Sequence, residues 1–119
     1  MENFRQYEST YLVRPDLSEA DFKQIVDKFN KVLATGNAQI INQEIWGLQK
    51  LAYQIERFSS AYYVFTEFKA PPELIRKLER EYGFDERVIR NLTVVMDKDG
   101  IAYADRRRNK RKQSAEVVA

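Results

Sequence analysis

The strongest constraint on the fold is a pair of strand-like segments, residues 39–55 and 61–68, joined by a short polar link. So short a link favours two adjacent antiparallel strands. The first segment has 17 residues, whereas strands rarely exceed about ten. Gly47 lies inside it, and a residue without a side chain tolerates the distortion of a bulge. The sequence therefore predicts an antiparallel pair with a bulge or sharp bend near Gly47.

Two helices are predicted from their ends and from apolar residues at helical spacing. Ser18 is a favourable N-cap residue, and acidic residues follow it in the first turn. Apolar residues then recur at helical spacing up to Leu33, and Gly36-Asn37 provides a left-handed exit. A second helix begins at Pro71-Pro72-Glu73, where a missing N–H costs nothing, and ends at Gly83.

The order of these elements predicts the fold class. Alternating β-branched and aromatic residues add strands at residues 4–13 and 88–96. The resulting order is strand, helix, strand, strand, helix, strand, which contains two interleaved strand–helix–strand crossovers. We therefore predict an α+β protein, a ferredoxin-like split β-α-β sandwich. It has a four-stranded antiparallel-type mixed sheet with two helices on one face.

With both helices on one side, the other face of the sheet is open. Residues 61–68 alternate, and their more apolar set is expected to face the helices. Which residues of the long strand join the open face depends on where the bulge flips the register. An exposed aromatic patch usually marks a contact surface, although the rings can instead pack on one another. The candidate partner-protein residues are Trp46, Leu48, Tyr53, Tyr63 and Phe65.

The residue inventory argues against catalysis. The chain contains no cysteine and no histidine, which excludes disulfides, catalytic triads and zinc sites built on these residues. Scattered carboxylates such as Glu79 and Glu81 have the pattern of a solvated surface. We therefore predict no enzyme activity, no catalytic residue, no metal site and no cofactor. No window reaches the roughly 18 apolar residues of a membrane span, and a cytoplasmic location is expected.

Charge is unevenly distributed along the chain. Residues 101–119 contain six Lys/Arg and two Asp/Glu, a balance of +4, whereas residues 1–100 contain 14 and 16, a balance of −2. Clustered cations repel one another, so we predict a ferredoxin-like domain of residues 1–97 and a flexible, disordered basic tail of residues 98–119. The tail either binds an anionic partner such as RNA or only aids solubility. Its candidate RNA-binding residues are Arg106, Arg107, Arg108, Lys110, Arg111 and Lys112.

Two segments carry a family resemblance. Residues 7–17 and, above all, residues 47–55, with a glycine, a basic position and then Leu-Ala-Tyr-x-Ile, resemble the bacterial small-subunit ribosomal protein S-six family. The resemblance extends over residues 4–96 and includes Arg90 ahead of residues 92–95.

This resemblance implies a non-catalytic, structural component of the small ribosomal subunit in the cytoplasm. Members pair with ribosomal protein S-eighteen, and the pair binds the central domain of the small-subunit ribosomal RNA during assembly. By position, the implied RNA contacts here are Arg5 and Arg90; Asn91 stands where the family can have a second arginine. The resemblance implies neither a membrane nor a small-molecule substrate.

Two other functions share this architecture. A regulatory domain that binds a small molecule would need a polar pocket, and the sequence has no glycine-rich ligand loop. A hydrolase of the acylphosphatase type would need an anion-binding loop after the first strand, which residues 14–17 do not resemble.

Overall fold

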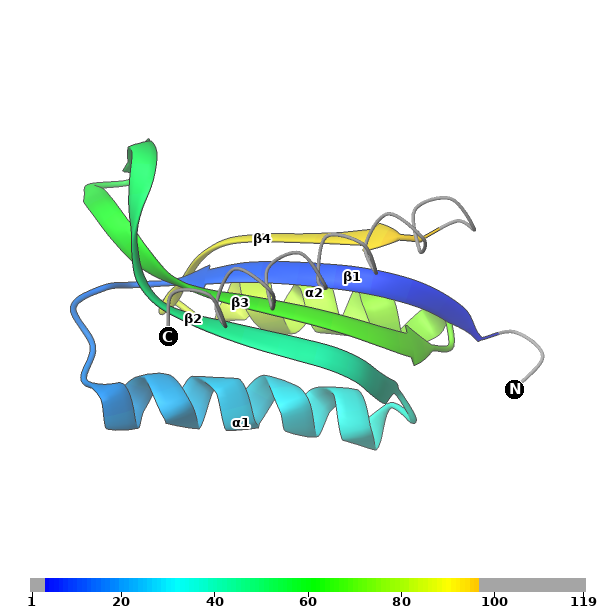
Figure 1. Cartoon of the computed structure of the whole chain (residues 1–119). Coiled ribbons are helices and arrows are strands. Elements are labelled where there is room, and N and C mark those ends of the chain that lie inside the picture. The colour runs from blue at the N-terminus through cyan, green and yellow to red at the C-terminus, as the bar shows by residue number, and fades with distance from the viewer. Residues whose placement is uncertain (1–3, 97–119) are drawn as a thin grey trace, which may run out of the picture.

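Six elements follow one another in the computed structural model, which describes residues 4–96. They are β1 (Arg5–Val13), α1 (Glu19–Thr35), β2 (Gln39–Ile55), β3 (Phe58–Ala70), α2 (Glu73–Phe84) and β4 (Val88–Val95). Both helices lie on the same side of the sheet (Figure 1), which confirms the predicted ferredoxin-like arrangement. The predicted boundary between residues 1–97 and 98–119 lies outside the described residues and stays a prediction.

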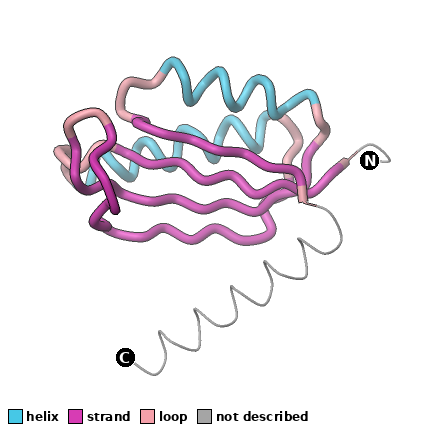
Figure 2. The backbone as a smooth tube through the Cα atoms, turned by 90° about the horizontal axis from the view of Figure 1, so that it is seen from above, coloured by secondary structure: helices cyan, strands magenta, loops and turns pink. Residues whose placement is uncertain are grey.

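The sheet has the strand order β2-β3-β1-β4, and the strands run side by side (Figure 2). All three neighbouring pairs are antiparallel, so the part of the sheet that the structure describes has no parallel pair and is not of mixed type. β2 and β4 are the two edge strands. Their outer edges offer backbone N–H and C=O groups to a partner strand.

Helix α1 begins and ends where the sequence predicted. The Ser18 hydroxyl accepts a hydrogen bond from the backbone N–H of Asp21 at 3.1 Å. At the other end Gly36 has φ −88° and only Asn37, with φ 66°, is left-handed. Gly36 is small for another reason, because a Cβ there would overlap the Leu74 side chain of α2. The left-handed exit predicted at Gly36-Asn37 is therefore present, and Asn37 provides it.

The bulge predicted at Gly47 is present. The β2–β3 register shifts between Trp46 and Leu48, and a Cβ on Gly47 would meet nothing within 4 Å. Two further shifts, between residues 40 and 42 and between residues 50 and 55, were not predicted. Beyond Gly47 the β2–β3 hairpin rises out of the sheet on the side opposite the helices (Figure 1). This bend gives the open face a wall at one end.

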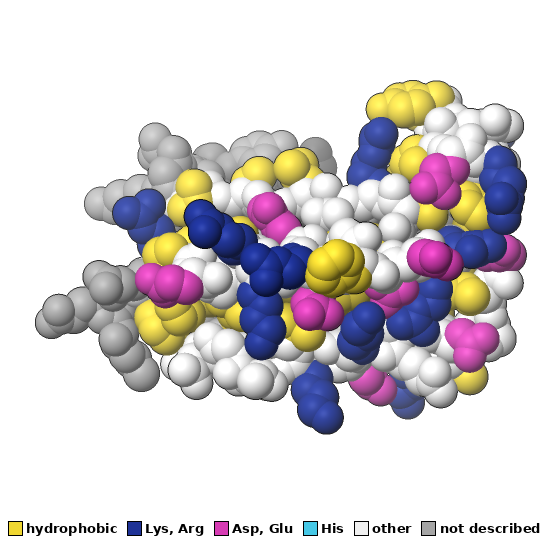
Figure 3. Space-filling view, turned by 180° about the vertical axis from the view of Figure 1, so that it is seen from behind, with side chains coloured by type: hydrophobic (Ala, Val, Ile, Leu, Met, Phe, Trp, Pro, Cys, Tyr) yellow, Lys and Arg dark blue, Asp and Glu magenta, His cyan; other side chains and the backbone are white. Residues whose placement is uncertain are grey.

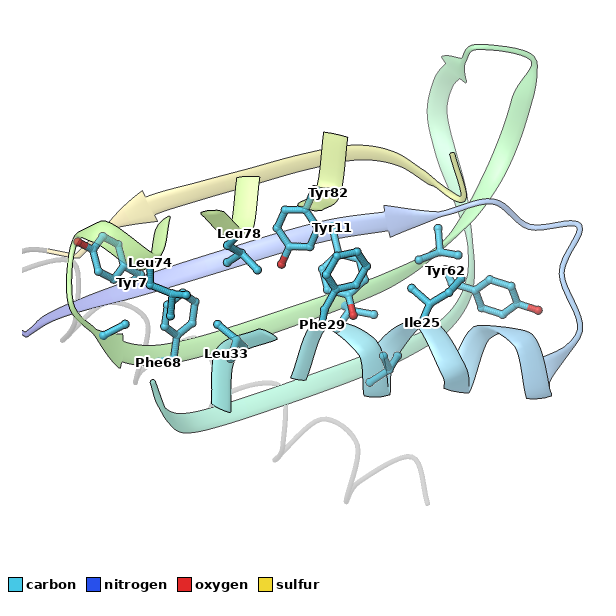
Figure 4. Close-up of a cluster of buried hydrophobic side chains, with 14 of the residues drawn as sticks. Tyr7, Tyr11, Ile25, Phe29, Leu33, Tyr62, Phe68, Leu74, Leu78 and Tyr82 are labelled. Atoms are coloured by element: carbon cyan, nitrogen blue, oxygen red, sulfur yellow. The ribbon is translucent and has the colours of Figure 1, made fainter. Parts of the chain in front are cut away.

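The main core lies between the helices and the sheet (Figure 4). At its centre the rings of Tyr11, Phe29 and Tyr82 meet with centroids 4.6 to 5.1 Å apart. Aromatic rings at such distances add to the free energy of burial. The strands contribute the side chains of Tyr7, Tyr11, Val13, Tyr62, Val64, Phe68 and Ala70. The apolar set of β3 thus faces the helices, as predicted.

Three polar side chains form a hydrogen-bonded chain within this core. The hydroxyls of Ser9 and Tyr82 are hydrogen-bonded at 2.8 Å, and Thr93 Oγ1 donates to Ser9 Oγ at 3.1 Å. Burial raises the pKa of Tyr82, so its phenol remains neutral. These contacts connect β4 through β1 to α2.

A buried carboxylate joins α1 to the loop between α2 and β4. Asp85, whose side chain is 4% exposed, accepts from Arg87 Nη2 at 2.8 Å and from Lys28 Nζ at 2.9 Å. Hydrogen bonds from Arg87, and secondly from Lys28, hold the pKa of Asp85 well below its usual range. The charged carboxylate therefore fixes the position of α1 relative to α2.

Candidate interaction surface

The open face of the sheet consists of three rows of side chains that the strand registers bring together. The first row is Asn42, Glu67, Glu8 and Val94; the second is Glu44, Phe65, Thr10 and Leu92; the third is Trp46, Tyr63, Leu12 and Arg90. Adjacent rows are about 7 Å apart, because side chains on one face of a strand recur every two residues. We call this set the open face. It is acidic in its first row, mixed in its second and aromatic in its third.

Three rings form a cluster on the open face. Trp46 lies 5.0 Å from Phe65 and 6.1 Å from Tyr63, measured between ring centroids, and Tyr63 lies 6.2 Å from Phe65. All three side chains are half-buried. The prediction that Tyr63 and Phe65 point away from the helices is confirmed, and the register places Trp46 beside them. Such a cluster offers flat, rigid apolar area for a partner.

A hollow of about 240 Å³ lies beside this cluster, between the open face and the raised hairpin. Leu12 and Leu51 belong to a small second core there, with Ala61. Tyr53 of the hairpin, which is 67% exposed, and Arg90 of β4 both line the hollow. Its residues are Leu12, Leu51, Ala52, Tyr53, Ile55, Tyr63 and Arg90. The hollow could receive an apolar or aromatic group next to a cation.

The structure separates Leu48 from the other candidate residues. The register shift at Gly47 pairs it with Tyr62, whose side chain packs on Phe22 of α1. Leu48 therefore lies on the helix side of the hairpin, where it is exposed. Sequence alternation could not show this, because the bulge reverses which residues of β2 share a face.

The two predicted RNA-binding arginines of the domain lie far apart. Arg5 is at the start of β1 opposite Ala70, and Arg90 is opposite Leu12 near the other end of the sheet. Arg5 and Leu12 are seven positions apart on β1, which corresponds to about 23 Å. Both side chains are exposed. They do not form one site, so a single ligand would have to be long to contact both.

The remaining predicted RNA-binding residues cannot be placed. Arg106, Arg107, Arg108, Lys110, Arg111 and Lys112 lie outside the described residues. Among residues 4–96, no group of three or more Asp and Glu could hold a metal ion, and neither helix is long and apolar enough to span a membrane.

The helix side of the molecule differs from the open face in its charge, which is mixed. A hollow of about 430 Å³ between α1 and α2 is lined by Lys28, Lys31 and Lys77, but also by Glu81. Seen from behind (Figure 3), Lys and Arg side chains are interspersed with Asp and Glu side chains. Mixed charge of this kind produces only a weak field on an RNA phosphate chain.

Sequence reasoning missed the acidic part of the open face. Glu8 and Glu67 are directly opposite each other on β1 and β3, and Glu44 lies in the next row. Glu67 is only 4% exposed. Alternation alone places Glu8 and Glu67 on the open face, but their juxtaposition requires the register.

Comparison with known proteins gives one consistent result. The family model for ribosomal protein S6 matches residues 6–95. The chain is 49% identical over 104 residues to small ribosomal subunit protein bS6 of Phocaeicola vulgatus, covering 87% of this chain and 91% of the relative. It is 45% identical over 111 residues to the protein of the same name from Porphyromonas gingivalis, and the match covers 93% of this chain and 95% of that relative.

A solved structure agrees in fold. The crystal structure of 30S ribosomal protein S6 from Thermotoga maritima superposes with a TM-score of 0.76 at 24% identity, covering 93% of this chain and 98% of that one. At this identity the match supports the fold alone.

Proposed function

Because the chain belongs to the ribosomal protein S6 family, we propose that it binds small-subunit ribosomal RNA together with ribosomal protein S-eighteen and so supports assembly of the central domain. Its coarser role follows from the family: it is a structural, non-enzymatic component of the small ribosomal subunit, which places it in the cytoplasm. The family match over residues 6–95 is the observation that carries the proposal.

The open face is the surface that we propose for the partner protein. The cluster of Trp46, Tyr63 and Phe65 and the hollow beside Tyr53 offer apolar, rigid contact area. Aromatic anchors of this type dominate the energy of many protein interfaces. Leu48 can contribute only if the partner also extends around the hairpin, because it lies on the opposite side.

For RNA we propose separate contacts at Arg5, at Arg90 and along Arg106–Lys112. Arginines position a protein on the phosphate chain without reading sequence. Arg5 and Arg90 are about 23 Å apart along β1, so the RNA would have to follow the length of the sheet. A domain with a balance of −2 over residues 1–100 has little general attraction for RNA. This charge is why a basic partner would strengthen binding.

The test asks whether the two proteins bind the RNA cooperatively. Binding of a central-domain RNA fragment is measured for this protein alone, for S-eighteen alone and for the equimolar mixture. We expect the pair to bind much more tightly than either protein. Equal affinities for the single proteins and the mixture would contradict the proposal.

A matched pair of variants tests the RNA contact. Arg90→Gln should weaken RNA binding by the pair and reduce the salt dependence by about one released counterion. Arg76→Gln removes the same charge from the exposed side of α2 and should change neither. If both variants behave alike, the effect comes from net charge and Arg90 makes no specific contact.

A further inference from the structure

The outer edge of β2 presents a row of exposed aliphatic side chains. Ile40, Ile45 and Leu48 are opposite residues of β3 that belong to the main core, so all three lie on the helix side of the sheet. Ile41 adjoins them as the extra residue of a bulge, and the four side chains are between 42% and 50% exposed. We call these four residues the β2 row. Because β2 is an edge strand of the described sheet, its outer backbone N–H and C=O groups adjoin this row.

The β2 row is uncharged. Glu44 is the only charged residue among positions 40–48, and it lies on the open face. The Gln43 side chain is turned inward, where its Nε2 donates to Asn30 Oδ1 of α1 at 2.7 Å and to Thr66 Oγ1 at 3.0 Å. A second copy of the row can therefore approach it without bringing like charges together. A strand edge is a template for pairing with another chain, and an uncharged row favours a copy of itself.

Few registers are possible for two antiparallel copies of β2. Side chains directly opposite each other must share a face of the joined sheet, so the two-fold axis has to pass through a residue position. Between the bulges at Ile41 and Gly47, an axis at Glu44 would oppose two carboxylates, which is destabilising. An axis at either end of this run would lead the pairing into a bulge. Axes at Gln43 and at Ile45 remain.

Helix α1 distinguishes between these two axes. It runs antiparallel to β2 (Figure 1), and its Asn30 lies beside Gln43. From Gln43 to Ile45 the strand advances about 7 Å, which corresponds to roughly four to five residues of α1 in the opposite direction. An axis at Ile45 therefore crosses α1 near residue 26, whereas an axis at Gln43 crosses it near Asn30.

Charges on α1 favour the axis at Ile45. Lys23 and Asp27 are on the side of the helix that carries Asn30, because they precede it by seven and three residues. Both side chains are exposed. Two antiparallel copies of α1 that cross near residue 26 place Lys23 of each copy close to Asp27 of the other. An axis near Asn30 would instead place Lys23 opposite Asn37, without a pair of opposite charges.

We propose that two copies of this chain form a weak dimer by antiparallel pairing of their β2 strands about a two-fold axis at Ile45. The two Ile45 side chains meet at the axis, and the rest of the β2 row extends the apolar contact. Lys23 of each copy pairs with Asp27 of the other. The row spans about 26 Å, a smaller contact than a standard protein interface, so the dimer dissociates on dilution. This inference does not rest on the proposed function.

Sedimentation equilibrium of the full-length protein, without RNA or S-eighteen, measures the association. We expect the weight-average mass to rise with concentration from that of one chain toward that of two. Ile45→Lys should keep the protein monomeric at every concentration, because it places two like charges opposite each other at the axis. The matched control, Leu92→Lys, adds the same charge to an exposed aliphatic position on the other edge strand and should associate like the parent. Circular dichroism verifies that both variants are folded.

An exchange of charges tests the register. Lys23→Asp should weaken the dimer about fivefold, because the substituted position then repels Asp27 of the other copy. Adding Asp27→Lys brings opposite charges together again across the axis and should restore the parental dissociation constant. Both positions are exposed on α1, so the folded chain should tolerate the exchange.

Hydrogen exchange identifies the strand that pairs. Backbone amides within residues 42–46 of β2 should exchange more slowly at high than at low protein concentration, because some of them become hydrogen-bonded across the new strand pair. The amides of β4, at the other edge of the sheet, should exchange at the same rate at both concentrations.

Four results would overturn the proposal. A constant mass of one chain at every concentration would exclude the dimer, and equal dissociation by Ile45→Lys and Leu92→Lys would reduce the effect to net charge. Failure of Asp27→Lys to restore association would reject the axis at Ile45. If the protein stayed monomeric and Ile45→Lys weakened its titration with S-eighteen, the β2 row would belong to that partner. None of these results contradicts the proposed function.

Discussion

The two faces of one sheet differ in what their side chains do. On the helix side, Val64 and Phe68 of β3 are fully buried beneath α1 and α2. On the open side, exposed Leu92 and Val94 share rows with glutamates. Alternation along a strand keeps these sets physically separate. The difference teaches that substitutions on the helix side should change stability, whereas substitutions on the open side should change binding.

The largest expected effect is on the helix side. Leu78→Ala truncates a fully buried side chain of α2 and should lower the free energy of unfolding by about 3 kcal/mol. The matched open-face variant, Leu92→Ala, removes the same atoms at a 64% exposed position and should change it by less than about 0.5 kcal/mol. Denaturant unfolding of both proteins measures the contrast. Equal losses of unfolding free energy for the two variants would contradict the assignment of stability to the helix side and of binding to the open side.

The second effect concerns the buried carboxylate that joins the helices. Asp85→Asn leaves Lys28 and Arg87 without a counter-charge and should cost about 2 kcal/mol, less than a fully buried pair because both cations reach water. Lys28→Met removes one of the two donors and should cost less. Unfolding at neutral pH gives both values. If Asp85→Asn left the free energy of unfolding unchanged, the cost of desolvating the carboxylate would equal the stabilisation from its contacts with Lys28 and Arg87.

The same residue predicts a pH dependence. Because the pKa of Asp85 is lowered in the folded protein, its contribution is fully present above the unfolded pKa of about 4 and is lost as pH falls toward the folded value. Stability should therefore decrease below about pH 4 more steeply in the parent than in Asp85→Asn. Parallel curves for the two proteins would contradict this assignment.

A smaller pair of effects tests packing between the helices. Gly36→Ala has an allowed backbone, but its methyl group would overlap Leu74 and should cost about 1 kcal/mol. Gly83→Ala, in α2, meets nothing within 4 Å and should stabilise by about 0.5 kcal/mol. The midpoint temperature of thermal unfolding should therefore fall for Gly36→Ala and rise for Gly83→Ala. Stabilisation by both would mean that Leu74 moves aside without cost.

Local signals predicted most of the fold because each acts within a few residues. The Ser18 cap and the bulge at Gly47 are both present where the sequence placed them. The left-handed exit predicted at Gly36-Asn37 is present at Asn37. The packing constraint on Gly36 was not predicted, because it comes from Leu74, far along the chain. A conformational signal and a packing constraint both select glycine, and sequence alone does not distinguish them.

The surface was less predictable because it depends on register. Tyr63 and Phe65 follow from alternation alone, and their outward direction is confirmed. Leu48 was grouped with them, yet the single extra residue of the bulge moves it to the opposite side. The pairing of Glu8 with Glu67 likewise exists only once β1 and β3 are aligned. Long-range register therefore determines the candidate site.

The smallest expected stability effect gives the sharpest test of the two-face division. Tyr53→Ala truncates a 67% exposed ring that lines the hollow near Arg90, and Phe84→Ala truncates a 75% exposed ring at the end of α2. Each should change the free energy of unfolding by less than about 0.5 kcal/mol.

The effects of these two variants on partner binding should differ, because only Tyr53 adjoins the proposed interface. Titration with S-eighteen should give roughly tenfold weaker binding for Tyr53→Ala, as for the loss of an aromatic anchor, and parental binding for Phe84→Ala. If only Phe84→Ala weakened binding, the partner would have to contact the helix side, because both rings are largely exposed and only the one on α2 would then matter.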